Sequence, residues 1–171
     1  WGITYDLVNS TRVEDWQKFV KSETKMLYLE TPSNPALDIF DLSAFASFAK
    51  ANTILLVVDN CFATPYLQNP IDHGCDLVIH SATKYIDGQG RVLGGVVAGR
   101  SDLVSAIVPF MRNAGPTLSP FNAWILSKSL ETLSVRMDRH CENAMGLALY
   151  LENKPEVLYV KYPFLTSHPG N

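Results

Sequence analysis

Four polar residues follow two short apolar runs, and together they could do chemistry that none of them does alone. Asp59 comes directly after the apolar run 54–58, and Ser81, Thr83 and Lys84 follow the run 76–80. Ligands of open α/β sheets bind beyond the carboxyl ends of parallel strands. If the two runs are neighbouring parallel strands, these side chains meet at one edge of the sheet.

An amine, a carboxylate and two hydroxyls in one place suit pyridoxal phosphate. The amine of Lys84 can form an imine with the aldehyde, while a carboxylate such as Asp59 keeps the pyridine nitrogen protonated. Hydroxyls and backbone N–H groups hold the phosphate dianion. A plainer interpretation fits the same residues, because a lysine beside a strand is often a solvated surface group and an Asp there often caps a helix. Spacing alone does not distinguish the two.

The surrounding pattern predicts the elements that would position these residues. Short, mostly apolar segments predict strands over 26–30, 54–58, 76–80 and 93–98, and 54–58 is a continuous apolar run typical of a strand buried on both faces. Asp41 is a suitable cap for a helix whose apolar residues recur at helical spacing up to residue 49. Strands that alternate with helices indicate an α/β domain with a mainly parallel sheet and flanking helices.

The last third of the chain has a different pattern. Ser119 and Pro120 are a typical helix start, and a helical stripe continues, in a straight or bent helix, to about Leu151. The run 157–160 then predicts the first strand of a further unit. We therefore expect residues 1–130 to form the central part of a large domain. Residues 131–171 would form a linking helix and the start of a small C-terminal domain.

Composition and charge exclude several other classes of protein. The net charge is −3, which gives no basic footprint for nucleic acid. No apolar run is long enough to span a bilayer. Three cysteines without close spacing indicate free thiols in a reducing compartment, so we expect a cytoplasmic protein. The chain lacks the glycine spacing of dinucleotide and P-loop sites and the ligand spacing of a zinc site, so no metal is expected.

Three ordered motifs carry a more specific resemblance. They are Glu30-Thr31-Pro32-Ser33-Asn34-Pro35, then Val58-Asp59-Asn60-Cys61-Phe62, then His80-Ser81-Ala82-Thr83-Lys84-Tyr85. In this order and spacing they resemble the Cys/Met-metabolism family of pyridoxal phosphate enzymes. The resemblance is close to continuous over 26–99 and implies a fold-type I pyridoxal phosphate transferase.

The resemblance also implies a role for each site residue. Lys84 would be the Schiff-base lysine, Ser81 and Thr83 phosphate ligands, and Asp59 the partner of the pyridine nitrogen. Asn34 would lie near the cofactor's phenolic oxygen or the substrate carboxylate. One departure is Cys61, which stands where the family usually has Thr, and a thiol hydrogen-bonds more weakly than a hydroxyl. We expect Cys61 to be an inert buried thiol.

The segment 85–95 indicates the subgroup, because it resembles O-succinylhomoserine sulfhydrylases more than the lyases. The implied reaction is a γ-replacement: sulfide takes the place of the ester group of an O-acylhomoserine, with O-succinylhomoserine preferred, so that the carboxylic acid leaves and homocysteine is formed. A thiol is the alternative second substrate. Cystathionine γ-synthase, cystathionine γ-lyase and methionine γ-lyase remain alternatives. The chain resembles less than half of a family member, so an inactive truncated core is another alternative. Family members are typically tetramers of catalytic dimers, and we expect self-association from that resemblance.

Overall fold

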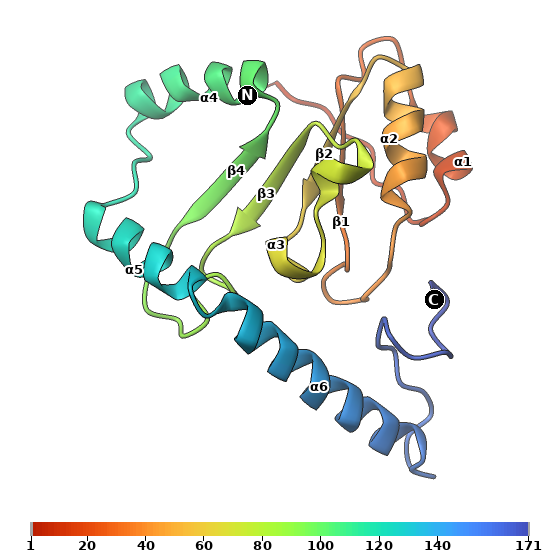
Figure 1. Ribbon diagram of the computed structural model, residues 1–171. Coiled ribbons are helices and arrows are strands. Elements are labelled where there is room, and N and C mark those ends of the chain that lie inside the picture. The colour runs from red at the N-terminus through yellow and green to blue at the C-terminus, as the bar shows by residue number, and fades with distance from the viewer. Residues whose placement is uncertain (1, 171) are drawn as a thin grey trace.

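The computed structural model describes residues 2–170, which are organised around a four-stranded sheet (Figure 1). The strands lie in the order β1 (Met26–Glu30), β2 (Leu55–Asp59), β3 (Leu77–Ser81) and β4 (Gly95–Gly99). The first three are parallel, and β4 runs antiparallel to β3. The mainly parallel sheet predicted from the sequence is confirmed, and each predicted strand lies within two residues of its observed start.

Helices flank the sheet and continue beyond it. In chain order they are α1 (Val13–Trp16), η1 (Gln17–Phe19), α2 (Leu42–Ala51), α3 (Thr64–Leu67), η2 (Pro70–His73), α4 (Ser101–Ala114), α5 (Pro120–Leu130) and α6 (Leu133–Glu152). Figure 1 shows α6 extending away from the sheet, with the C-terminal segment returning beside it. That segment is tied back to the turn after β1, since Lys161 Nζ lies 2.6 Å from Asp38 Oδ1.

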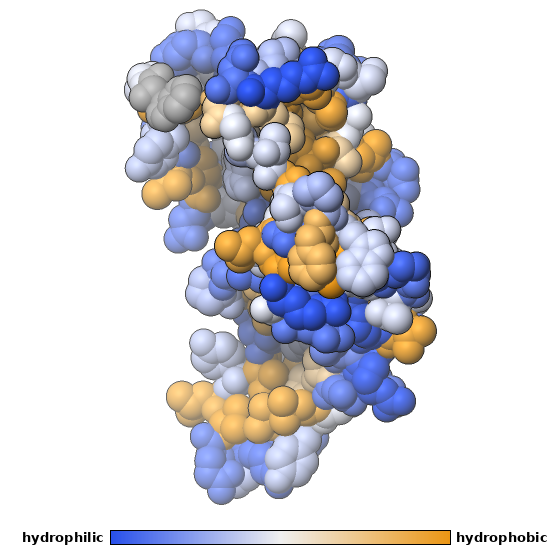
Figure 2. Space-filling model, turned by 90° about the vertical axis from the view of Figure 1, so that its left-hand side faces the viewer, coloured by the Kyte–Doolittle hydropathy of each residue, from blue (hydrophilic) through white to orange (hydrophobic). Residues whose placement is uncertain are grey.

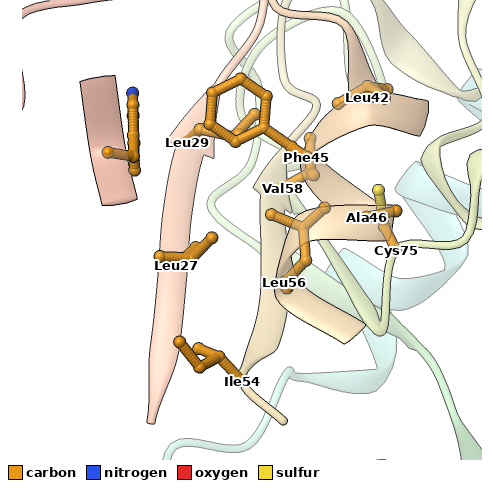
Figure 3. Close-up of a cluster of buried hydrophobic side chains, with 11 residues drawn as sticks. Leu27, Leu29, Leu42, Phe45, Ala46, Ile54, Leu56, Val58 and Cys75 are labelled. Atoms are coloured by element: carbon orange, nitrogen blue, oxygen red, sulfur yellow. The ribbon is translucent and has the colours of Figure 1, made fainter. Parts of the chain in front are cut away.

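The main core lies between α2 and one face of β1 and β2 (Figure 3). Side chains alternate between the two faces of a strand, so Leu27 and Leu56 point to this core, and α2 contributes Phe45. The Phe45 side chain is fully buried, and its ring lies edge-on to Trp16 and Phe40, with centroids 5.0 and 5.5 Å away. Such aromatic pairs add to the stabilisation from burial alone.

The two helix starts expected from the sequence are confirmed. The Asp41 carboxylate accepts the backbone N–H of Ala44 at 3.0 Å and so caps α2. The Ser119 hydroxyl accepts the N–H of Asn122 at 3.1 Å, with Pro120 at the first position of α5. Each bond satisfies a donor that the helix cannot pair internally.

A smaller apolar cluster fastens the turn after β3 to α5. Ala82 and Ile86 are buried against Leu126 of α5, with Val92 packed beside them. The turn over residues 82–87 carries Lys84. Its apolar side chains therefore anchor the segment that presents the predicted cofactor lysine.

Two expectations about the last third of the chain need correction. The helical pattern up to residue 151 is two helices, α5 and α6, interrupted at residues 131 and 132. The predicted strand over 157–160 is wrong: that segment is irregular, and no strand among residues 2–170 lies beside it to accept its hydrogen bonds. Helix α4 was missed, because Pro109 lies inside it and an interior proline normally argues against a helix.

We predict that Phe45→Ala lowers the free energy of unfolding by about 3–5 kcal/mol, because it leaves a cavity between α2 and the sheet. Urea denaturation monitored by circular dichroism measures the change. Phe121→Ala is the matched control, since the Phe121 side chain is exposed and its loss should cost below about 1 kcal/mol. Equal losses for the two variants would contradict this placement of the core.

Candidate functional site

The register of the parallel strands brings the ends of β1, β2 and β3 to one edge of the sheet. Asp59 lies opposite Glu30 on one side and Ile79 on the other. Ser81 is two residues beyond Ile79, so its side chain lies on the same face as that of Asp59. This face is opposite to the one that packs against α2. The core and the chemical groups thus occupy different faces of the same strands.

Both carboxylate oxygens of Asp59 accept hydrogen bonds. The backbone N–H of Cys61 donates to Oδ1 at 3.1 Å, and the Tyr28 hydroxyl donates to Oδ2 at 3.1 Å. Partial burial, together with the negative charge of Asp59, raises the pKa of Tyr28 to about 12. Tyr28 therefore remains a proton donor at neutral pH, and the carboxylate keeps a fixed orientation.

Cys61 links Asp59 to the end of β3. Its buried sulfur accepts the backbone N–H of Ser81 at 2.7 Å, and its thiol also interacts with the Asp59 carboxylate. Burial and this carboxylate raise the pKa of the Cys61 thiol to about 11. The thiol is protonated at neutral pH and poorly nucleophilic, as the sequence led us to expect. Its hydrogen bonds give it a positioning role that the sequence did not reveal.

The two hydroxyls and the lysine lie at the start of the turn after β3. Ser81 Oγ and Thr83 Oγ1 are 2.7 Å apart, so they form one hydroxyl pair. The backbone N–H of Lys84 donates to the Ser81 carbonyl at 3.2 Å, which closes the turn beneath the lysine side chain. Lys84 itself is exposed, so its amine is accessible to a ligand.

Asn34 lies in the turn that follows β1. Its backbone N–H donates to Glu30 Oε2 at 2.9 Å, and Glu30 stands opposite Asp59 in the register. Asn34 is exposed at the same edge of the sheet. The turn that carries it is thus fixed next to the strand that carries Asp59.

Sequence reasoning missed two members of this site, Tyr28 and Glu30. Tyr28 stands opposite Val57, two residues before Asp59, so strand alternation places both side chains on one face. That pairing was available in principle, but it required the register between β1 and β2. Glu30 was named as the end of a predicted strand and the first residue of a motif, with no role of its own.

His80 shows how the two faces differ at the edge of β3. His80 directly precedes Ser81 in β3, so the two side chains point to opposite faces of the sheet. The His80 side chain is buried, and its Nδ1 has no hydrogen-bond partner among the described residues. Burial lowers the pKa of His80, while Asp59 and the backbone of Asn60 oppose the shift. A neutral His80 adds no positive charge beside the Asp59 carboxylate.

A cavity of about 460 Å³ lies beside this edge but does not include the site. It lies between the loops after β1 and β2, helix α6 and the C-terminal segment, with Phe62, Met137 and Tyr162 in its lining. Asp59, Ser81, Thr83 and Lys84 do not line it. The chemical groups instead lie on an open part of the sheet edge.

The donor set at this edge fits pyridoxal phosphate. The Ser81–Thr83 pair offers two hydroxyls for a phosphate, and a hydrogen bond to each oxygen orients the Asp59 carboxylate, the group that a pyridinium nitrogen would pair with. Lys84 is the exposed amine on the adjoining turn. Each group has the chemistry that one part of the cofactor needs.

Known proteins are similar in sequence to this chain over almost its whole length. The sequence model described as Cys/Met metabolism PLP-dependent enzyme matches residues 1–171. An O-succinylhomoserine sulfhydrylase of Pseudomonas aeruginosa is 51% identical over 169 residues, which are 99% of this chain and 42% of the relative. A cystathionine beta-lyase of Lactococcus lactis is 44% identical over 171 residues, 99% of this chain and 45% of the relative.

Solved structures agree in fold. A structure described as metB from Corynebacterium glutamicum superposes on this chain with a TM-score of 0.95 and is 44% identical in sequence. The superposition includes 99% of this chain and 44% of that structure. Cystathionine gamma-lyase from Lactobacillus plantarum, solved with L-serine, gives a TM-score of 0.93 and is 36% identical. Here the superposition includes 99% of this chain and 45% of the other. The chain spans less than half the length of these relatives. Its sequence and fold place it in the Cys/Met-metabolism family of pyridoxal phosphate-dependent enzymes.

Proposed function

We propose that this chain forms the lysine-bearing part of a γ-replacement enzyme that converts O-succinylhomoserine and sulfide to homocysteine. The observation that carries the proposal is the joint placement of Asp59, the Ser81–Thr83 hydroxyl pair and exposed Lys84 at one sheet edge. The choice of reaction is supported by the 51% identity to an O-succinylhomoserine sulfhydrylase.

The family cofactor, when bound, supplies an aldehyde that binds amines and a ring that accepts electrons from the neighbouring carbon. Lys84 Nζ would hold the aldehyde carbon and, once displaced by the substrate amine, would accept the proton from the substrate α-carbon. Asp59 would keep a proton on the ring nitrogen, and Ser81 and Thr83 would hold the phosphate. Asn34 would contact the phenolic oxygen or the substrate carboxylate.

Carbon–sulfur lyase activity is the second candidate. A cystathionine beta-lyase is 44% identical to this chain, and an L-methionine gamma-lyase of Fusobacterium nucleatum is 41% identical over 173 residues. Lyases share the proton abstraction at the α-carbon and differ in what leaves and what adds afterwards. The residues at this edge could act in either reaction, so identification of the product is needed to distinguish a sulfhydrylase from a lyase.

Self-association is part of the same proposal. Strand β4 is exposed along its whole length, and α4 has no buried residue among those described. Figure 2 shows apolar groups among the polar ones on the side of the molecule that faces left in Figure 1, where α4 and α5 lie. This exposure supports a homo-oligomer, and we propose a tetramer of catalytic dimers, as the family resemblance implies.

The cytoplasm is the compartment we propose. Cys61, Cys75 and Cys141 are all free thiols, which suits a reducing environment. Within residues 2–170, no helix combines the length and apolar character that crossing a membrane requires.

We predict that borohydride reduction of the protein loaded with pyridoxal phosphate attaches the cofactor to Lys84. Peptide mapping by mass spectrometry locates the adduct. Lys84→Ala should abolish it and reduce turnover by about 10³-fold, since the proton acceptor is lost. Lys50→Ala, a change at another exposed lysine, is the control and should leave both unchanged. A folded protein with no adduct at Lys84 would disprove the cofactor role.

The product assay separates the two candidate reactions. With O-succinylhomoserine and sulfide we expect homocysteine and succinate in equal amounts, because sulfide takes the place of the γ-ester. With cystathionine we expect slow or no formation of a keto acid. The reverse pattern, measured by chromatography of both products, would favour the lyase.

We predict that Cys61→Ala costs about 1–3 kcal/mol of unfolding free energy, because the Ser81 N–H loses its acceptor. Cys61→Thr should cost less, since a hydroxyl can accept from Ser81 and donate to Asp59. Urea denaturation of the two variants compares them. If Cys61→Ala is as stable as the wild type, the sulfur does not support the end of β3.

A further inference from the structure

A buried aspartate and two arginines fasten the turn that carries Lys84. Asp87, at the end of this turn, is almost fully buried, and its carboxylate accepts from the backbone N–H of Arg91 at 2.6 Å and from Arg91 Nε at 3.0 Å. Arg91 NH2 also donates to the Ser129 hydroxyl at 2.6 Å. This contact joins the segment after Lys84 to the last turn of α5.

Arg136, from α6, holds the same turn from the other side. Its NH1 donates to the Tyr85 carbonyl at 2.6 Å, and its NH2 donates to the carbonyls of Ile86 at 3.3 Å and Ser129 at 3.0 Å. One planar guanidinium thus ties the turn to the junction of α5 and α6. Lysine could not replace it, because an ammonium lacks the fork of donors that reaches several carbonyls at once.

The charges in this cluster depend on one another. Burial opposes ionisation of Asp87, but hydrogen bonds and the charge of Arg91 outweigh it and lower the pKa of the carboxyl. Burial and the neighbouring Arg91 lower the pKa of Arg136, whereas Asp87 opposes that shift. Asp87 is therefore paired directly with Arg91, and its negative charge also favours the charged form of Arg136.

Gly88 makes room for this arrangement. Its φ is +76°, and a Cβ at this position would collide with the Arg136 guanidinium. Its backbone N–H donates to the Lys84 carbonyl at 2.8 Å. The residue that lets Arg136 approach is therefore bonded directly to the backbone of the lysine.

We propose that Asp87, Arg91 and Arg136, here called the Asp87 latch, are positioning residues that hold the Lys84 turn at a fixed place relative to Asp59 and the Ser81–Thr83 pair. The inference rests on the proposed function, because it assumes that Lys84 carries the cofactor. The latch does not touch the cofactor edge itself. It acts through the backbone of residues 84–88, which it joins to α5 and α6.

The test compares Arg136→Met with Arg139→Met in the holoprotein. Arg139 lies on the same helix, and its side chain is 70% exposed and paired only with Glu142 among the ion pairs of the described residues. We expect Arg136→Met to lower kcat by roughly 10- to 100-fold with little change in KM, since a displaced lysine transfers protons poorly. The pH midpoint of the bound cofactor's visible absorption should shift as well. Arg139→Met should change neither quantity.

Arg91→Lys is the second variant, in case Arg136→Met does not fold. It keeps a charge beside Asp87 but cannot reach both Asp87 and Ser129 with a fork of donors. We expect a kcat reduced by about tenfold, which corresponds to about 1.4 kcal/mol, and a shifted absorption midpoint.

Two different results would overturn the proposal. If folded Arg91→Lys or Arg136→Met proteins are less stable but keep the wild-type kcat and absorption midpoint, the latch is structural only. If the wild-type holoprotein forms no adduct at Lys84, the proposed function fails and the positioning role fails with it. The borohydride trap on the wild type distinguishes the second case from the first.

Discussion

The parallel register of β1, β2 and β3 is the constraint on which the rest of the structure depends. It sets Glu30, Asp59 and Ile79 side by side, so that the strand ends meet at one edge. A shift of one residue in β2 would move Asp59 to the face packed against α2 and would take Leu56 and Val58 out of the core that they form with α2. Burial of this apolar face therefore fixes the register, and the register places the carboxylate. The hydrophobic core positions the site without contributing a chemical group to it.

A second constraint acts on the turn after β3. Its backbone carbonyls at Tyr85 and Ile86 need hydrogen-bond donors, because the turn packs against α5. Arg136 and the backbone of Thr132 both donate to the Ser129 carbonyl, which would otherwise accept the next N–H of a continuous helix. The break between α5 and α6 and the anchoring of the Lys84 turn thus share one set of hydrogen bonds. This explains why a helical sequence pattern that continues to residue 151 is divided near residue 131. The sequence could not show it, because Arg136 and the turn it binds are about fifty residues apart.

Local signals predicted the parts of the fold that depend on neighbouring residues. Apolar runs located all four strands, and Asp41 and Ser119 were identified as caps because capping involves residues only three positions apart. The run 157–160 looks equally apolar, yet it has no strand beside it among the described residues, and Leu158 is almost fully exposed. Strand formation needs a partner as well as a propensity. For the same reason, motifs along the chain could identify Lys84, Asp59 and the hydroxyls as candidates, whereas the contact of Tyr28 with Asp59 required the register between β1 and β2.

The Cys61 position connects these two kinds of constraint. A threonine there would use a hydroxyl to bridge Asp59 and the Ser81 N–H, and the thiol occupies the same bridging place. Sulfur is larger and a weaker donor than oxygen, so the bridge holds Asp59 less strongly. The Tyr28 hydroxyl and the Cys61 N–H compensate, because each holds one oxygen of the carboxylate independently of the thiol. The orientation of Asp59 is thus determined by the strand edge as a whole, which is why a sequence can depart from its family at Cys61 and still hold this carboxylate in place at the edge of the sheet.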